Sequence, residues 1–462
     1  MKVITNKGQK KVTSNDLYWF VDSNSSARTK HYTVLGDMNL SRNLVSTKNY
    51  DPDNSYIIDG DIRIQNNRVS FKISDLIDLI YPKGDSYRLF TKAIMGAHVN
   101  DTGFTGAGVF QDKLYFASIN STVSNTASGA KLFVYDGTSF STYTKEAMGL
   151  PSANHDSSRQ FCVYNNRLYF EMQNSSTNTD KTATCLIAFD GTNFQVYTKS
   201  VIGLNANDTR IMPLGIYQDK LFLATSNSTA ATDLTAAKII VFDGTSFVLI
   251  PKSDLGCVNA DTSFNGLAEF NGKAYMGTYN TTAATDINGA KLLVYDGTTW
   301  STILKSQINC VNGHTWFPSF LSTGSYLCIS AYSTNTSLYD YQGTKILVYD
   351  GTKWREITRG SAASPVYIWS LAYFGGALCA GGQKSSASNT VACYTQIDCR
   401  PFQASLGSTM PNYKWFIRYN SSESIHFMKV FNGSLYVFTY SAWVSSNMYN
   451  LGPKVICKGT AV

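Results

Sequence analysis

Four aspartates stand at related places in the chain and have the chemistry to collect a hard cation. Asp101, Asp156, Asp208 and Asp261 lie in the segments VNDT, ANHD, ANDT and NADT, and Ca²⁺ and Mg²⁺ prefer oxygen ligands such as carboxylates. The alternative is that each Asx-Thr pair closes its own loop through hydrogen bonds between side chain and backbone. We favour this second interpretation and predict no bound metal and no cofactor.

The sequence has no recognisable catalytic set. It contains no phosphate loop, no GxSxG elbow and no HExxH zinc motif, so no nucleophile, base and orienting residue can be assigned. The segment YDGTTW resembles the Asp-box of sialidases, but that box has one residue between its Asp and Gly, which are adjacent here as Asp296 and Gly297. The twelve arginines form no evident carboxylate-binding cluster. We therefore predict a non-enzymatic protein.

Aromatic and amide side chains gather in or beside long polar loops. Tyr and Trp offer flat, amphipathic faces to sugar rings or to protein partners. For the aromatic residues, packing between repeat units is the alternative role. The residues that we predict to bind a ligand are Asn120, Asn174, Asn227, Tyr279, Asn280, Trp316, Tyr332, Tyr339, Trp369 and Trp443.

A repeat determines where these residues lie. One motif recurs as KLFVYDGTSF, CLIAFDGTNF, KIIVFDGTSF, KLLVYDGTTW and KILVYDGTKW, and its glycines are 54, 53, 53 and 54 residues apart. Two degenerate copies, TQIDCRPF and VICKGTAV, bring the number of copies to seven. A fixed period of this length is typical of propellers and other repeat architectures.

Each copy contains four strand signals. In the fourth copy they are Ser263–Phe270, Lys273–Tyr279, Lys291–Tyr295 and Thr298–Leu304. The first two are separated by Asn-Gly and the last two by Asp-Gly, dipeptides that favour hairpin turns in which both central residues have positive φ. Four antiparallel strands per unit, repeated radially, predict an all-β fold: a seven-bladed β-propeller over residues 87–462.

The two ends of the repeat array suggest how the ring closes. The chain ends where the seventh copy would begin its fourth strand, and Tyr87–Lys92 (YRLFTK) matches the fourth strands FSTYTK and FQVYTK of later copies. We expect this N-terminal strand to complete the last blade and so remove an exposed sheet edge. The long connections all fall on one face of the disc, where we expect binding.

Residues 1–86 do not share the period. The alternating run Asp61–Ile73 predicts a hairpin about Asn66-Asn67, and Ser74–Pro82 predicts a short helix capped by Ser74. We interpret these residues as an anchoring or oligomerising segment. An irregular layer packed on the propeller is equally compatible with the sequence.

The composition excludes several classes of protein. Only 15% of the residues are charged, and the net charge of +7 is spread along the chain, so we predict no nucleic-acid-binding face. No apolar run resembles a secretory signal or a membrane span. The nine cysteines have no CxxC spacing and lie mostly in apolar, strand-like runs. This pattern favours buried free thiols over a disulfide or metal framework.

Few charges, loops rich in Asn, Ser and Thr, and no export signal together suggest a virion protein assembled in the host cytoplasm and released by lysis. With a short non-repeating segment before the propeller at residues 87–462, the layout resembles bacteriophage fibre or receptor-binding proteins, some of which carry propeller heads. The resemblance implies contacts with other virion proteins through residues 1–86, and binding of host-surface glycan or protein through the long-loop face. Homo-oligomerisation is compatible with it. The alternatives are a bacterial cell-surface lectin-like propeller, a glycan-cleaving propeller enzyme and an intracellular interaction scaffold.

Overall fold

The computed structural model is an all-β structure. It describes residues 87–459 apart from 99, 121–128, 151–157, 159, 174–183, 228–236, 281–288, 335–342, 359–366, 375–376, 387–388, 399–422 and 442–454, together with short strands between residues 2 and 72. The chain divides into two compact units, Met1–Leu89 with Cys457–Val462, and Phe90–Ile456. Among the helices that the structure describes, none has both the length and the apolar character needed to cross a bilayer.

Two small antiparallel sheets precede the repeats. One has the strand order β2-β1-β3 and the other β4-β5-β6. Their strands are β1 (Lys2–Thr5), β2 (Gly8–Lys11), β3 (Thr33–Leu35), β4 (Tyr56–Ile58), β5 (Asp61–Ile64) and β6 (Ser70–Lys72). Strands β5 and β6 pair with Asp61 opposite Lys72, which confirms the hairpin predicted in this run. The connection at Asn66-Asn67 and the helix predicted at Ser74–Pro82 lie outside the described residues.

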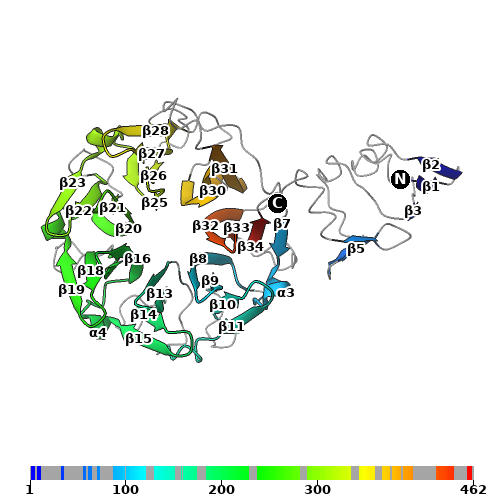
Figure 1. Ribbon diagram of the computed structural model, residues 1–462, viewed down its shortest axis with the longest axis horizontal. Coiled ribbons are helices and arrows are strands. Elements are labelled where there is room, and N and C mark those ends of the chain that lie inside the picture. The colour runs from blue at the N-terminus through cyan, green and yellow to red at the C-terminus, as the bar shows by residue number, and fades with distance from the viewer. Residues whose placement is uncertain are drawn as a thin grey trace. The chain divides into compact units, whose positions relative to one another are not determined.

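The larger unit consists of antiparallel sheets arranged radially around a common centre (Figure 1). The strands of each repeat pair in chain order, and bridges between repeats join some of these groups into larger sheets. The four-stranded sheets are β8 (Gly103–Phe110), β9 (Lys113–Ile119), β10 (Leu132–Tyr135), β11 (Phe140–Tyr143); β12 (Phe161–Tyr164), β13 (Arg167–Gln173), β14 (Thr184–Phe189), β15 (Phe194–Thr198); β16 (Met212–Tyr217), β17 (Lys220–Ala224), β18 (Lys238–Phe242), β19 (Phe247–Pro251); β20 (Asp261–Phe270), β21 (Lys273–Asn280), β22 (Leu292–Tyr295), β23 (Trp300–Ile303); and β25 (Phe320–Ser322), β26 (Leu327–Ser333), β27 (Lys345–Tyr349), β28 (Trp354–Thr358). These bounds confirm the strands predicted for the fourth copy.

The last part of the array departs from this pattern. The sheet after β28 has three described strands, β29 (Tyr367–Phe374), β30 (Ala377–Ser386) and β31 (Asn389–Asp398). Then come β32 (Glu423–Phe431), β33 (Ser434–Ser441) and β34 (Val455–Gly459), and the strand order continues from β34 to β7 (Tyr87–Phe90). The strand predicted at Tyr87–Lys92 therefore neighbours the last strand of the chain.

Contacts between successive sheets lead around the centre and return to the first sheet. Hydrogen bonds join neighbouring sheets at Gln111–Asp190, Tyr164–Asp219, Tyr217–Gly272, Ser319–Leu371 and Ser370–Met428. The short strand β24 (His314–Trp316) bridges β21 and β26. From the last sheet, β33 pairs with β8 at Tyr440 and Gly103, and the Phe431 ring lies 6.4 Å from that of Tyr135. The ring of sheets is thus closed.

The first hairpin turn of most repeats has the predicted geometry. Both central residues have positive φ, for example 46° and 54° at Gln111 and Asp112, and 49° and 70° at Asn271 and Gly272. Positive φ at both positions is the signature of a type I′ turn, whose twist matches that of the flanking strands. The predicted turn at Gly375-Gly376 lies outside the described residues.

The Asp-Gly turns differ from the prediction. In the fourth copy only Gly297 has positive φ, at 101°. The Asp296 carboxylate accepts hydrogen bonds from the backbone N–H groups of Thr298 and Thr299 at 2.9 and 2.8 Å, and from both of their hydroxyls at 2.8 Å. The prediction of a two-residue type I′ turn is wrong here, because the side chain of Asp organises a four-residue Asx turn instead.

Short helices that the sequence did not predict follow several outer strands. They are α3 (Lys92–Met95), α4 (Lys199–Ile202), η3 (Lys252–Leu255) and η4 (Lys305–Ile308). The hydroxyl of Thr91 caps α3, and Gly96 ends it with a φ of 70°, a left-handed conformation in which glycine carries no Cβ penalty. These helices lead the chain inward to the next sheet, and each begins with a lysine.

The described cysteines are free thiols. They are Cys162, Cys185, Cys257, Cys310, Cys328, Cys379 and Cys457. Burial raises the pKa of Cys162 and of Cys310 to about 12, so both stay protonated and unreactive near neutral pH. The side chains of Cys393 and Cys399 lie outside the described residues.

Candidate functional site

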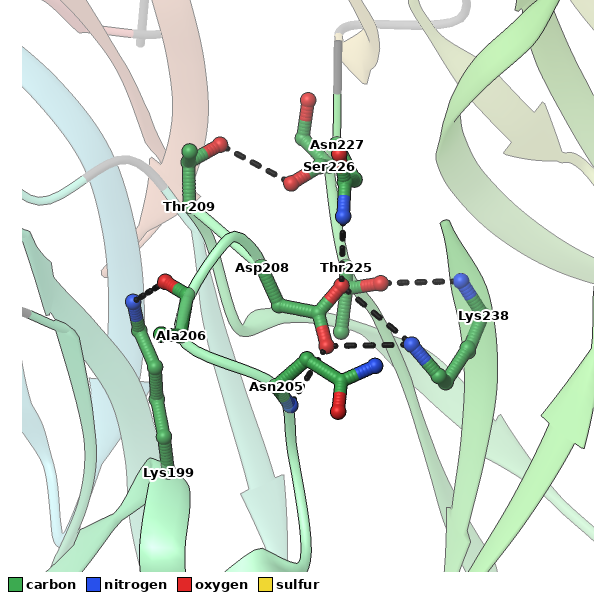
Figure 2. A network of polar contacts seen from close by, with 9 residues as sticks. All are labelled: Lys199, Asn205, Ala206, Asp208, Thr209, Thr225, Ser226, Asn227 and Lys238. Atoms are coloured by element: carbon green, nitrogen blue, oxygen red, sulfur yellow. Dashed lines mark hydrogen bonds and ion pairs between the residues drawn. The ribbon is translucent and has the colours of Figure 1, made fainter. Parts of the chain in front are cut away.

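Asp208 lies at the centre of a buried polar network (Figure 2). Its Oδ2 accepts a hydrogen bond from the backbone N–H of Asn205 at 3.0 Å, and its Oδ1 accepts one from the side-chain amide of Asn227 at 3.3 Å. The Lys238 ammonium contacts both carboxylate oxygens, at 3.3 and 3.0 Å. The Asp208 side chain is fully buried and that of Lys238 is 7% exposed. The network joins the loop before β16 to the end of β17 and the start of β18.

The same network recurs in the next sheet. Asp261 accepts hydrogen bonds from the backbone N–H of Val258 at 2.9 Å and from the Asn280 amide at 3.0 Å, and it pairs with the Lys291 ammonium at 2.9 Å. The Lys291 side chain is 1% exposed. A charge this deeply buried is tolerated only when it is paired and hydrogen-bonded, and here the repeat supplies the carboxylate, ammonium, amide and backbone N–H together.

A related arrangement surrounds Asp101 in the first sheet. Its carboxylate accepts hydrogen bonds from the backbone N–H of His98 at 2.8 Å and from the Asn120 amide at 3.1 Å. Burial raises the pKa of Asp101 to about 6, although these hydrogen bonds and the charge of Lys131 act in the opposite direction. Desolvation of the charged form therefore outweighs the stabilising contacts at this copy.

His314 takes the place of the aspartate in the fifth copy. Its Nδ1 accepts a hydrogen bond from the Val311 N–H at 3.1 Å, and its Nε2 donates to the carbonyl of Gly343 at 3.0 Å. Burial, together with the nearby positive charge of Lys345, lowers the pKa of His314 to about 4, so the ring is neutral. A neutral ring cannot balance an ammonium, and Lys345 instead pairs with Glu356 at 2.5 Å.

A second set of lysines supports the loops between sheets. The Lys199 ammonium donates to the carbonyl of Ala206 at 2.8 Å (Figure 2). Lys252 donates to Asn259, Lys305 to Asn312 and Lys92 to Asp101, in each case to a backbone carbonyl. These lysines start the short helices that follow the outer strands, so the helix and the buried ammonium together shape the loop.

The structure gives the predicted asparagines a role inside the fold. Asn120, Asn227 and Asn280 are at most 1% exposed, and their amides donate to the aspartates described above. Among the described residues no group of three or more His, Cys, Asp and Glu side chains is placed to hold a metal ion. The geometry at Asp101, Asp208 and Asp261 matches the loop-closing interpretation, and Asp156 lies outside the described residues.

Three of the aromatic residues predicted to bind a ligand lie in one row, and a fourth lies beside it. Tyr279, Trp316, Trp369, His426 and Tyr440, which we call the aromatic row, follow one another with ring centroids 5.4, 5.0, 5.2 and 4.8 Å apart. All five side chains are half-buried. They come from four successive sheets, at the end where the second strands finish and the long loops begin. The first three of these five are binding residues predicted from the sequence.

The fourth predicted aromatic residue flanks the row. Tyr332 stacks on Tyr367 with centroids 4.4 Å apart, and their hydroxyls are hydrogen-bonded at 3.0 Å. Tyr367 in turn stacks parallel to Trp369 at 5.3 Å. Rings at these separations stabilise one another in offset or edge-to-face geometry, so the row has a rigid second layer at its centre.

Register shifts in two inner strands orient two rings of the aromatic row. The pairing register shifts between Ile368 and Ser370 in β29 and between Ile425 and Phe427 in β32. Trp369 and His426 are the residues left between these register partners. A β-bulge re-aims a side chain that would otherwise follow the alternation of the strand, so both rings come to lie along the ring of sheets.

The two indoles of the row keep hydrogen-bonding capacity. Within the part of the chain that the structure describes, the buried Nε1 atoms of Trp316 and Trp369 have no hydrogen-bond acceptor. Indole N–H groups usually find an acceptor when they are buried. Asn174, Tyr339 and Trp443, also predicted to bind, lie outside the described residues.

The lysines of the buried networks and two members of the aromatic row were not predicted from the sequence. Lys131, Lys238, Lys291 and Lys345 each follow the aspartate or histidine of their copy by 30 or 31 residues, and each begins the third-strand motif. That fixed spacing is the signal that could have found them. His426 and Tyr440 carry no such signal, because their copy is degenerate.

No protein-family model matches the sequence, and no curated protein matches it. Similar solved structures include YCF48 from Cyanidioschyzon merolae, with 8% identity, a TM-score of 0.49, and coverage of 81% of this chain and 98% of that one. The endosialidase of phage phi92 has 11% identity and a TM-score of 0.45, over 81% and 69% of the two chains. The β-propeller domain of the Trilobed protease from Pyrococcus furiosus has 7% identity and a TM-score of 0.43, over 74% and 90%. Similarities at this level assign no activity to the chain.

Proposed function

We propose that this chain is a non-enzymatic virion protein whose seven-bladed β-propeller binds a glycan of the host-cell surface along the aromatic row. The aromatic row is the observation that supports this proposal. It places half-buried rings from four sheets in one row whose successive ring centroids are 4.8 to 5.4 Å apart. Sugar rings present apolar C–H faces to aromatic planes, so the exposed parts of these rings suit a glycan.

Seven blades are supported by the repeat and by the closure of the ring. Five clear and two degenerate copies of one motif occur in the sequence. The contacts between sheets run in order from β8 to β33 and return to β8. The strand order from β33 through β34 to β7 supports β7 as the outer strand of the last blade. An electron-density map with six or eight sectors would contradict this count.

Glycan binding is tested on an array of purified bacterial surface polysaccharides. We expect Trp369→Ala to weaken binding of a retained polysaccharide about thirtyfold, which corresponds to about 2 kcal/mol for loss of a central aromatic contact. The matched control is Tyr373→Ala, because Tyr373 is 46% exposed at the opposite end of the same strand, β29. We expect the control to bind as wild type does. Equal binding by wild type and Trp369→Ala would contradict the proposal, and so would retention of no polysaccharide.

The role in a virion rests on the sequence alone. Few charged residues, polar loops and the layout of a short segment before a propeller support it. Mass spectrometry of purified particles should find this chain, and its gene should lie beside capsid or tail genes. Genes for a secretion pathway in that position would favour the bacterial lectin-like alternative, and release of reducing ends from a bound polysaccharide would favour the glycan-cleaving alternative.

A further inference from the structure

The buried networks of the third and fourth repeats place three reactive groups together. In each, one carboxylate contacts both a lysine ammonium and an asparagine amide: Asp208 with Lys238 and Asn227, and Asp261 with Lys291 and Asn280. An amine, a carboxamide and an acid that can move protons between them are the components of an amide exchange reaction. We propose that Asn227 and Lys238, and likewise Asn280 and Lys291, become joined by an isopeptide bond inside the folded protein.

The sheet geometry brings the amine and the amide to the same face. The Thr225 N–H donates to the carbonyl of Lys238 at 2.9 Å, and the Lys238 N–H donates to the Thr225 hydroxyl at 2.8 Å, so these residues face each other across β17 and β18. Asn227 is two residues further along, and its amide reaches the same Asp208 carboxylate that the Lys238 ammonium contacts. Side chains in this diagonal relation are within reach of each other when one is long. The loop that carries Asp208 covers this face (Figure 2).

The surroundings favour reaction over hydrolysis. Asp208 and Asn227 are at most 1% exposed, and Asp261 and Asn280 are fully buried. Burial keeps bulk water, the competing nucleophile, away from the carboxamide carbon. The fixed geometry also replaces a bimolecular encounter by an intramolecular one.

The atoms and charges of the reaction balance without a co-reactant. The Lys238 ammonium transfers a proton to the Asp208 carboxylate, and the free Nζ attacks Cγ of Asn227. The new Nζ–Cγ bond forms as the Cγ–Nδ2 bond breaks. Asp208 passes its proton to Nδ2 and takes up the second proton of Nζ, so Nδ2 leaves as ammonia. Asp208 Oδ1 lies 3.3 Å from Nδ2, in position to act as general acid toward the leaving nitrogen, and Asp208 ends as a neutral carboxylic acid, so no unpaired charge remains in the buried site.

The fifth repeat is an internal control. His314 replaces the aspartate and pairs in register with Ser333, the residue at the position of the asparagine. In this repeat an imidazole therefore stands where the others have the carboxylic acid, and a hydroxyl stands where they have the carboxamide. Lys345, the equivalent of Lys238 and Lys291, contacts Glu356 instead. We expect no bond at Lys345. The bonds in the third and fourth repeats would tie the base of the long loops on the face that carries the aromatic row.

Intact mass and peptide mapping of the denatured wild-type protein test the proposal. Each bond removes one ammonia, so we expect a deficit of about 34 Da for two bonds. Trypsin cuts after unmodified lysine, so an acylated Lys238 leaves residues 221–252 as one fragment in place of 221–238. An acylated Lys291 leaves residues 274–305 in place of 274–291. Recovery of 221–238 and 274–291 at their sequence masses would overturn the proposal, and the networks would then be ion pairs only.

Variants separate the roles of the three groups. Lys238→Arg keeps a cation beside Asp208 but provides no amine of suitable nucleophilicity, and we expect it to lose one deficit of about 17 Da while keeping the other. Asp208→Asn should lose the same deficit although both Lys238 and Asn227 remain. Retention of the bond in Asp208→Asn would refute the proton-transfer role of Asp208. The bond between Asn280 and Lys291 should still form in each variant that folds, so its mass deficit serves as the control for folding.

Discussion

Acidification should destabilise the protein through His314, the buried ring that replaces an aspartate of the repeat. Its folded pKa, about 4, lies below the ordinary value of 6.5 because burial and the charge of Lys345 oppose protonation. The fold thus favours the neutral ring. The resulting stability is fully present above pH 6.5 and is lost as the pH falls toward 4. By linkage, the difference corresponds to about 3 kcal/mol in the free energy of unfolding, of which about 2 kcal/mol is lost by pH 5.

The perturbation that isolates this effect is His314→Asn. The new side chain does not titrate, and its oxygen can accept the Val311 N–H as the ring now does at 3.1 Å. Loss of the hydrogen bond from Nε2 to Gly343 should cost about 1–3 kcal/mol at every pH. A comparison with wild type is needed because Asp101 acts in the opposite direction. Its raised pKa, about 6, makes the protein more stable as the pH falls from 6 toward 3.8.

Urea unfolding followed by tryptophan fluorescence at pH 7.5 and pH 5 provides the assay. We expect the stability deficit of the variant relative to wild type to shrink by about 2 kcal/mol between the two pH values. Wild type alone should show a weaker pH dependence, since His314 and Asp101 oppose each other. A deficit that is the same at both pH values would refute the assignment of a depressed pKa to His314.

Two further predictions compare matched sites. Arg210→Met removes the counter-charge of the fully buried Glu171 carboxylate and should cost about 3–5 kcal/mol, whereas loss of Arg355, which is 37% exposed and 3.6 Å from its partner, should cost less than about 1 kcal/mol in the same urea titration. Gly266→Ala should lower the thermal midpoint well below that of Gly272→Ala. Both positions have positive φ, but a Cβ at Gly266 would lie 2.4 Å from a ring carbon of Phe320, while nothing lies within 4 Å at Gly272; equal midpoints would contradict the clash.

The repeat makes the strands and their order predictable from the amino-acid sequence. Hairpin pairing is local, and an apolar run on each side of Asn271-Gly272 leaves few alternatives. The closing strand at Tyr87 is predictable for a different reason, because its sequence matches the fourth strands of later copies. Dipeptide signals predict the wrong turn type where a side chain hydrogen-bonds to the turn backbone. At Asp296 the carboxylate accepts four hydrogen bonds, and the turn lengthens to four residues.

Polar residues near the loops could not be sorted from sequence alone. Asn227 and Trp316 both fall at loop positions, yet the first is fully used inside the fold and the second is half-buried in the aromatic row. The difference depends on which loop covers which strand end. That is set by contacts between segments 19 residues apart, as for Asp208 and Asn227, and no local pattern reports them.

The order of strands, the hairpins and the repeat unit were determined by the sequence itself, because they depend on residues that are neighbours along the chain. Tertiary structure alone decided that aspartate, asparagine and lysine of one repeat share a buried site, and that rings from Tyr279 to Tyr440 form one row. The physical reason is that both features arise where separate segments meet around the centre of the ring. Desolvation and ring packing there depend on neighbours that are distant in sequence.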